Sequence, residues 1–182
     1  MAIEAIERPL PKPTDATYVE ARLLEMLVEA HPAFRLLEEE LTRNAAGKAF
    51  QTWKALLAAL LRLELDRLKA LAKTDEERRW LESAAVPGVP TVKMKPLARL
   101  LEAAGHGGLA LRTGNVLLHD CQYHGPDPGG ELSKYATRED AAADIAAAAQ
   151  EAARRVEPLK GRIKRGGGLE RALEEARRAL GR

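Results

Sequence analysis

The sequence predicts an all-α protein built as a helical bundle. Leucine, alanine, arginine and glutamate dominate its 182 residues, and apolar side chains recur at the spacing of one helix face. No segment alternates in the manner of a strand, and no repeat period occurs. Aromatic residues make up only 4% of the chain, so the core consists mainly of leucine, alanine and valine, which let helix axes approach closely.

The N-terminal half predicts an extended arm followed by two long helices. Three prolines hold residues 1–14 extended, and Thr17-Tyr18-Val19-Glu20 has the form of a capping box. Pro32 is expected to kink the first helix or divide it in two. Asn44-Ala45-Ala46-Gly47 is typical of a tight turn, and the second helix is expected from about residue 46 to 72. Two long helices joined by a short connection pack antiparallel.

Shorter helices are expected to complete the bundle, which we place at residues 15–160. Capping residues predict helices from Thr74 to about Ala84 and from Thr137 to about Glu157. Residues 86–90 are expected to form a loop, and helices are expected from about residue 96 and over residues 113–119. Residues 161–182 form a basic, glycine-rich linker and a C-terminal helix whose apolar stripe runs from Leu169 to Leu180.

Composition limits the classes of function. A net charge of +2 argues against a general polyanion binder but leaves room for a local basic patch. The longest apolar run, residues 55–61, is too short to cross a bilayer. A lone cysteine indicates a reducing compartment, and scarce Asn, Gln and Cys fit a heat-adapted source. We expect a cytoplasmic protein with no cofactor, no membrane partner and no sequence-specific DNA binding.

The polar segment from residue 117 to 144 holds the candidate site. Its His119, Cys121 and His124 could supply metal ligands, with Asp120 or Asp127 nearby. A closed zinc site usually draws two separated ligand pairs, and the chain offers no second pair. His119 and Cys121 would also lie on different sides of a helix. The sequence therefore predicts no metal site and favours a cysteine buried as a small hydrophobe.

A second interpretation is that this segment binds a nucleotide or another phosphate. The start of the Thr137 helix would present free amide groups to an anion, although Glu139 and Asp140 oppose this. The candidate ligand-binding residues are His119, Asp120, Tyr123, His124, Lys134, Tyr135 and Arg138.

Two features near the C-terminus suggest other partners. A basic cluster could contact RNA phosphates or could be a solvated linker, and no aromatic residues accompany it for base stacking. The cluster consists of Lys160, Arg162, Lys164 and Arg165. Alternatively, the apolar stripe from Leu169 to Leu180 could dock a partner protein.

Three blocks of the sequence resemble the archaeal PaREP family. They are NAAGKAFQTWKALL at residues 44–57, LHDCQYHGPDP at residues 118–128 and SKYATREDA at residues 133–141. That family is grouped with the HEPN superfamily, whose name abbreviates higher eukaryotes and prokaryotes nucleotide-binding. The resemblance implies a helical bundle with two long antiparallel helices, often paired as a homodimer.

Many HEPN proteins are metal-independent ribonucleases, and the resemblance offers Arg112 and His119 as a catalytic pair. On an unbroken helix, residues seven apart share a face. The arginine would hold the scissile phosphate, and the histidine would take the proton from a ribose 2′-hydroxyl. Thr113 stands where Asn, Asp or His is more usual, and Gly114 weakens the helix. The leading hypothesis is therefore a nucleotide- or RNA-binding homodimer, with an endoribonuclease and a protein-interaction module as alternatives.

Overall fold

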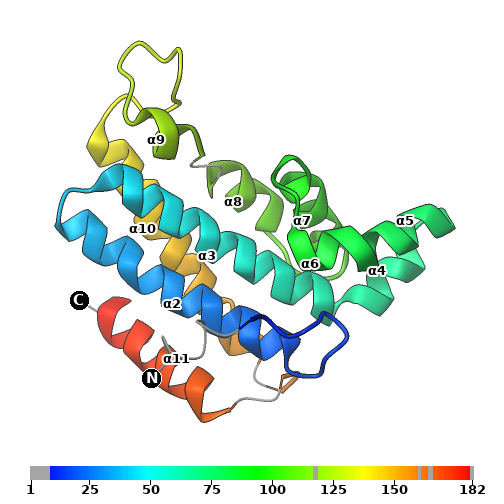
Figure 1. Ribbon diagram of the computed structural model, residues 1–182. Helices are drawn as coiled ribbons and strands as arrows, with labels where there is room; N and C mark the ends of the chain where they lie inside the picture. The colour runs from blue at the N-terminus through cyan, green and yellow to red at the C-terminus, as the bar shows by residue number, and fades with distance from the viewer. Residues whose placement is uncertain (1–8, 117–118, 160, 164–165, 181–182) are drawn as a thin grey trace.

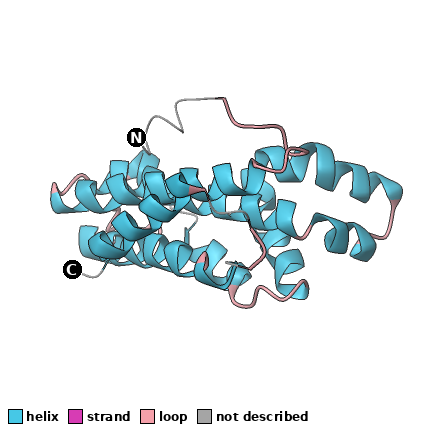
Figure 2. Cartoon of the chain, turned by 90° about the horizontal axis from the view of Figure 1, so that it is seen from below, coloured by secondary structure: helices cyan, strands magenta, loops and turns pink. Residues whose placement is uncertain are grey.

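The computed structural model describes residues 9–116, 119–159, 161–163 and 166–180, and over these residues it contains helices and no strands (Figures 1 and 2). The bundle is formed by α2 (Tyr18–Glu38), α3 (Thr42–Leu63), α10 (Arg138–Arg154) and α11 (Gly167–Leu180). The shorter elements are α4 (Leu65–Leu71), α5 (Asp75–Trp80), η1 (Leu81–Ala85), α6 (Val86–Gly88), η2 (Thr91–Lys93), α7 (Met94–Ala103), α8 (Leu109–Val116), α9 (His119–His124) and η3 (Glu157–Leu159).

Helices α2 and α3 pair antiparallel along the length of the bundle, which confirms the predicted fold class (Figure 1). Helix α10 packs against both of them, and α11 packs mainly against α2. Helices α7, α8 and α9 pack against α3, while α4 and α5 project from one end in both views (Figures 1 and 2). None of the described helices is both long and apolar enough to cross a membrane.

The turn between the two long helices is earlier than the sequence predicts. Helix α2 ends in a Schellman motif, in which Leu41 N–H donates to Leu36 O at 2.7 Å and Glu40 N–H donates to Leu37 O at 3.0 Å. Glu40 takes the left-handed position with φ of 58°. The predicted turn at residues 44–47 was wrong, because this segment lies in the first two turns of α3. The sequence did not indicate a turn at Glu40, because glycine or asparagine usually occupies the left-handed position after a helix.

Other predicted boundaries were partly correct. Thr74 and Thr137 cap their helices, each accepting a hydrogen bond from a backbone N–H three residues later at 3.1 Å. Thr17 makes no such side-chain bond, and α2 continues through Pro32 as one helix. Packing against α3 holds α2 together there, because Leu27, Ala30 and Ala33 are buried on both sides of the proline.

Two further corrections concern the places where helices are interrupted. The predicted second helix divides at Glu64, which ends α3 and begins α4. The predicted loop at residues 86–90 begins instead with the short helix α6, which follows α5 through the π-helical turn η1. The chain leaves helical geometry only at Val89, where φ is 39°.

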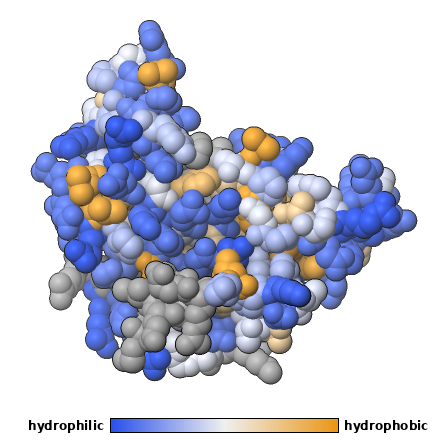
Figure 3. Space-filling model, viewed as in Figure 1, coloured by the Kyte–Doolittle hydropathy of each residue, from blue (hydrophilic) through white to orange (hydrophobic). Residues whose placement is uncertain are grey.

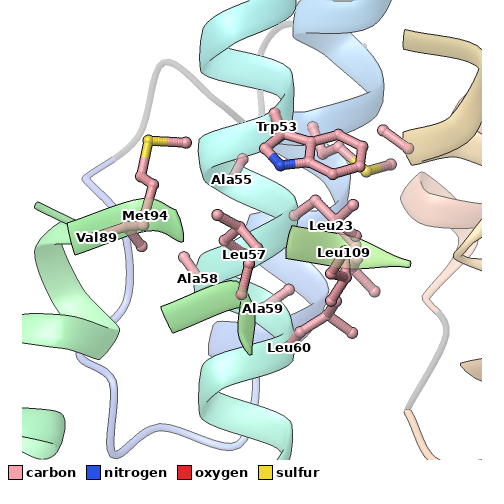
Figure 4. Close-up of a cluster of buried hydrophobic side chains, with 14 of the residues drawn as sticks. Leu23, Trp53, Ala55, Leu57, Ala58, Ala59, Leu60, Val89, Met94 and Leu109 are labelled. Carbon is pink, nitrogen blue, oxygen red and sulfur yellow. The ribbon is translucent and has the colours of Figure 1, made fainter. Parts of the chain in front are cut away.

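The core is built around the middle of α3 (Figure 4). Trp53 is fully buried there, and its Nε1–H donates to Thr113 Oγ1 of α8 at 2.9 Å. Alanines occupy much of the same helix, which allows neighbouring helices to approach closely. The alanines at this level are Ala55, Ala58 and Ala59.

The C-terminal helix is part of the bundle. Leu169, Ala172 and Leu173 of its apolar stripe are buried, and Gly166 N–H donates to Glu20 Oε1 of α2 at 2.7 Å. The side chains of Ala176 and Leu180 lie outside the described residues. The described part of the stripe thus packs within the chain and is not available to a partner protein.

Candidate functional site

Helix α9 lies against the N-terminal half of α3. Its Cys121 is fully buried in the main core. Gly47 of α3 faces Gln122 so closely that a Cβ atom at residue 47 would lie 3.1 Å from Gln122 Nε2. Gly47 therefore serves a close approach between helices, whereas the sequence suggested a turn at this position.

Arg43 fixes the C-terminal end of α9 to α3. Its Nε–H donates to Gln122 O at 3.1 Å, and its Nη2 donates to Tyr123 O. A cation at this end also complements the helix dipole. Gly125 ends the helix in the left-handed conformation, with φ of 75°, and its N–H donates to Cys121 O at 2.9 Å.

Replacing Arg43 with alanine is expected to loosen α9. Loss of two solvent-exposed hydrogen bonds should lower the local free energy of opening by about 1 kcal/mol. Amide hydrogen exchange in α9 should then be roughly fivefold faster. Arg35→Ala is a matched control, because among the described residues the exposed Arg35 side chain pairs only with Glu39. Unchanged exchange in α9 of the Arg43 variant would contradict the role assigned to Arg43.

Three polar residues share the exposed face of α9. Asp120 is three residues from Tyr123 and four from His124, so it neighbours both on the helix surface, and all three are exposed. Tyr123 is 57% exposed, an unusual position for an aromatic side chain in a protein with few of them. Because Cys121 is buried in the core and Arg43 holds the C-terminal end of α9, this face is held in a fixed orientation.

The loop after α9 is organised by Asp127. Its Oδ2 accepts a hydrogen bond from Leu132 N–H at 2.7 Å, and its Oδ1 accepts one from Gly129 N–H at 3.0 Å. These backbone bonds lower the pKa of the Asp127 carboxyl below its ordinary value. Asp127 N–H also donates to Tyr135 O at 2.7 Å. Asp127 therefore shapes this loop, a role that the sequence did not separate from metal binding.

Lys134 and Tyr135 form a cluster that follows the loop in sequence, in which Tyr135 is buried and Lys134 is exposed. The Tyr135 hydroxyl donates to Asp144 Oδ2 of α10 at 2.8 Å, and Lys134 Nζ lies 4.8 Å from the centroid of the Tyr135 ring. Burial raises the pKa of Tyr135, and the Asp144 carboxylate raises it further. Burial lowers the pKa of Lys134, although the nearby carboxylates of Asp144 and Asp120 act in the opposite direction.

The start of α10 is already supplied with negative charge. Thr137 caps it, and Glu139 and Asp140 stand in its first turn. Arg138 turns away to the α2–α3 turn, where it donates to Glu40 Oε2 at 3.3 Å and to Glu40 O at 3.0 Å. These contacts disfavour binding of an anion at this helix start.

The residues of the ribonuclease interpretation lie on separate elements. Arg112 is exposed on α8, and His119 begins α9, with its side chain outside the described residues. Thr113 points into the core, where its hydroxyl accepts the bond from Trp53. The polar group that should accompany the arginine is therefore not available to a substrate.

The metal and basic-cluster interpretations concern residues that are only partly described. Among described residues, no group of three or more His, Cys, Asp or Glu side chains could hold a metal ion. Burial raises the pKa of the Cys121 thiol, against the opposing charges of Arg43 and Lys134.

In the basic cluster, Arg162 donates to Glu64 Oε1 at 2.6 Å. The remaining members of the basic cluster, Lys160, Lys164 and Arg165, lie outside the described residues.

The structure thus divides the predicted ligand-binding residues into two groups. Asp120, Tyr123 and His124 lie on the exposed face of α9, while Lys134 and Tyr135 contact each other in the cluster after the loop. Sequence reasoning missed Arg43 and Asp144, which hold these two groups in place. Both stand among many similar charged residues on helices, so only their distant partners distinguish them.

The family comparison matches the same region of the chain. The model of the archaeal PaREP1/PaREP8 family matches residues 21–146, from α2 into α10. No curated protein and no solved structure matches the chain. Because the family match covers more than half of the sequence, the chain belongs to the archaeal PaREP1/PaREP8 family.

Proposed function

We propose that this protein is a HEPN-like cytoplasmic homodimer that binds a nucleotide or RNA, and that the exposed face of α9 is its base-binding surface. The observation that carries the proposal is the exposed ring of Tyr123 on a helix that Cys121 and Arg43 hold in place. Proteins that bind single-stranded nucleic acid stack bases on such aromatic side chains. The bundle with two long antiparallel helices is compatible with the HEPN superfamily.

Binding explains the contacts of this site better than catalysis. Cys121, Arg43 and Asp127 are used to hold α9 and its loop, so the exposed face does not need to rearrange to meet a ligand. Preorganisation of this kind lowers the entropic cost of association. The exposed Lys134 adds a cation in the segment after the loop, and phosphate contacts commonly accompany base stacking.

Replacing Tyr123 with alanine should weaken binding of a labelled single-stranded oligoadenylate by about tenfold or more, because stacking contributes about 1–3 kcal/mol per base. Fluorescence anisotropy at low and moderate salt measures this, with ATP as competitor. Tyr123→Phe should retain the affinity because it keeps the ring. Leu132→Ala is the matched control, since Leu132 is an exposed apolar residue of the neighbouring loop.

Equal affinities for the wild type and Tyr123→Ala, or no binding of either ligand, would refute the proposed surface. Light scattering of the same samples tests whether the protein is a homodimer. A monomer at the working concentration would refute that part of the proposal.

The endoribonuclease alternative is tested by incubating the same RNA with the protein in the presence of a metal chelator. Cleavage that is lost in His119→Ala would replace the binding proposal with the endoribonuclease alternative.

A further inference from the structure

A groove is lined by residues of α4, α5, η1 and α7. The α4–α5 pair projects from the end of the bundle away from α9 (Figure 1). Its volume is about 830 Å³, which is within the range of about 300–1,000 Å³ that holds small molecules. The described residues of the α9 face do not line it. The groove is therefore a second site, independent of the proposed base-binding surface.

The groove combines buried apolar walls with an apolar rim that water reaches. Leu68, Leu81 and Leu97 line it and are almost fully buried. Leu71 and Leu100 also line it and are 51% and 39% exposed. The face in Figure 3 is mainly hydrophilic, with hydrophobic residues in a few separate patches. Exposed leucines that converge on a concave surface indicate a ligand that covers them.

Trp80 gives the groove an aromatic wall. It is the last residue of α5 and is half-buried, in contrast to the fully buried Trp53. These are the two tryptophans of the chain. Trp80 is thus an intrinsic reporter of anything that displaces water from the groove.

Cations outnumber available anions around the groove. Lys73, Arg79 and Lys93 line it, and none forms an ion pair with any described acid. Two acids also line the groove, Glu76 and Glu77, but Glu77 accepts a hydrogen bond from Lys73 N–H at 2.6 Å as part of the α5 cap. The long stems of the lysines can lie along apolar surface while their charges face the rim.

We propose that this groove binds an amphipathic anion, namely an acyl or alkyl chain with one carboxylate or phosphate head. The chain lies along the leucine walls beside Trp80, and the head lies among the rim cations. Burial of the exposed parts of Leu71 and Leu100 drives binding. The rim cations select an anionic head over a cationic or uncharged one.

Titration of the full chain with dodecanoate and with dodecyl phosphate, both below their micellar concentrations, tests the proposal. Trp80 emission should shift to the blue and become less accessible to acrylamide, with saturation at one ligand per chain by calorimetry. The two probes distinguish a carboxylate from a phosphate head. Dodecyltrimethylammonium and acetate should not saturate the site, since the first has the wrong charge and the second lacks a chain.

Paired variants at exposed positions keep the fold intact. Leu71→Glu should weaken binding about tenfold through lost apolar contact, whereas Leu111→Glu should not, because Leu111 is exposed on α8 outside the groove. Lys93→Glu should weaken binding about fivefold. Lys95→Glu should leave the binding affinity unchanged, because Lys95 is exposed on the same stretch of chain but lies outside the groove.

Several results would overturn the proposal. They are no saturable binding of either anion, equal binding of the cationic probe, and equal loss of affinity in the control variants. Light scattering can give a further contradicting result. If Leu71→Glu dissociates an oligomer, a second copy of the chain covers the groove. Tyr123→Ala should bind dodecanoate normally, so failure of the α9 surface and failure of the groove are separate outcomes.

Discussion

Replacing Trp53 with alanine is expected to lower the free energy of unfolding by about 3–5 kcal/mol. The side chain is fully buried against residues of α2, α3 and α8, so its removal leaves a cavity that surrounding helices close only in part. It also leaves the buried hydroxyl of Thr113 without its donor. A domain of this size has about 5–15 kcal/mol of total stability, so this variant should lose a large fraction of it.

The contribution of the hydrogen bond can be separated from that of packing. Trp53→Phe keeps an aromatic ring but removes the Nε1–H donor, and Thr113→Val removes the acceptor while keeping the shape of the side chain. Each should cost about 1–3 kcal/mol, because each leaves one buried polar group unpaired. The double variant should be more stable than the sum of the two costs predicts. Urea unfolding followed by circular dichroism measures all four proteins, and additive costs would show that the bond contributes nothing.

The bundle could be predicted because its signals are periodic and repeated. Leucines and alanines at helical spacing fix which face of each segment is buried, and an error of a few residues does not change that face. The tight turn could not be located in this way, because it depends on one left-handed residue. Asn44 and Gly47 are common in turns, yet the chain places Glu40 in that conformation and uses Gly47 for contact with α9.

The break at Glu64 could not be predicted for a related reason. The residues around Glu64 are mostly good helix formers, and no glycine or proline nearby favours an interruption of the helix. We attribute the interruption to tertiary contacts, because the Glu64 carboxylate binds the side chains of His106 and Arg162. Contacts between residues so far apart in the sequence leave no local pattern.

The candidate site was predictable as a segment but not as a geometry. Helix α9 and the loop that follows it lie at one end of the molecule (Figure 1). Which side chains are exposed depended on packing. Burial of Cys121 against α3 sets the rotation of α9, and that rotation turns Asp120, Tyr123 and His124 to solvent.

The buried carboxylate of Glu64 should make a large contribution to stability. It is 5% exposed, and its Oε1 lies 2.8 Å from His106 Nε2 and accepts a hydrogen bond from Arg162 Nη1 at 2.6 Å. It thereby joins the α3–α4 junction to the α7–α8 loop and to the segment that leads to α11. Glu64→Ala should cost about 2–3 kcal/mol, since charged hydrogen bonds are lost and the solvent exposure of Arg162 limits the penalty.

The effect of Glu64 should depend on pH. Burial alone would raise the pKa of the Glu64 carboxyl, but hydrogen bonds and charges from Arg162 and His106 outweigh burial and lower it. A carboxyl with a lowered pKa in the folded state stabilises fully above its unfolded pKa of about 4.3 and loses this contribution as pH falls further. The difference in unfolding free energy between wild type and Glu64→Gln should therefore shrink as pH falls below about 4. Asp66→Asn is the control, because Asp66 is exposed in the same region. A difference that stayed constant down to pH 3 would show that the Glu64 charge does not join these three segments.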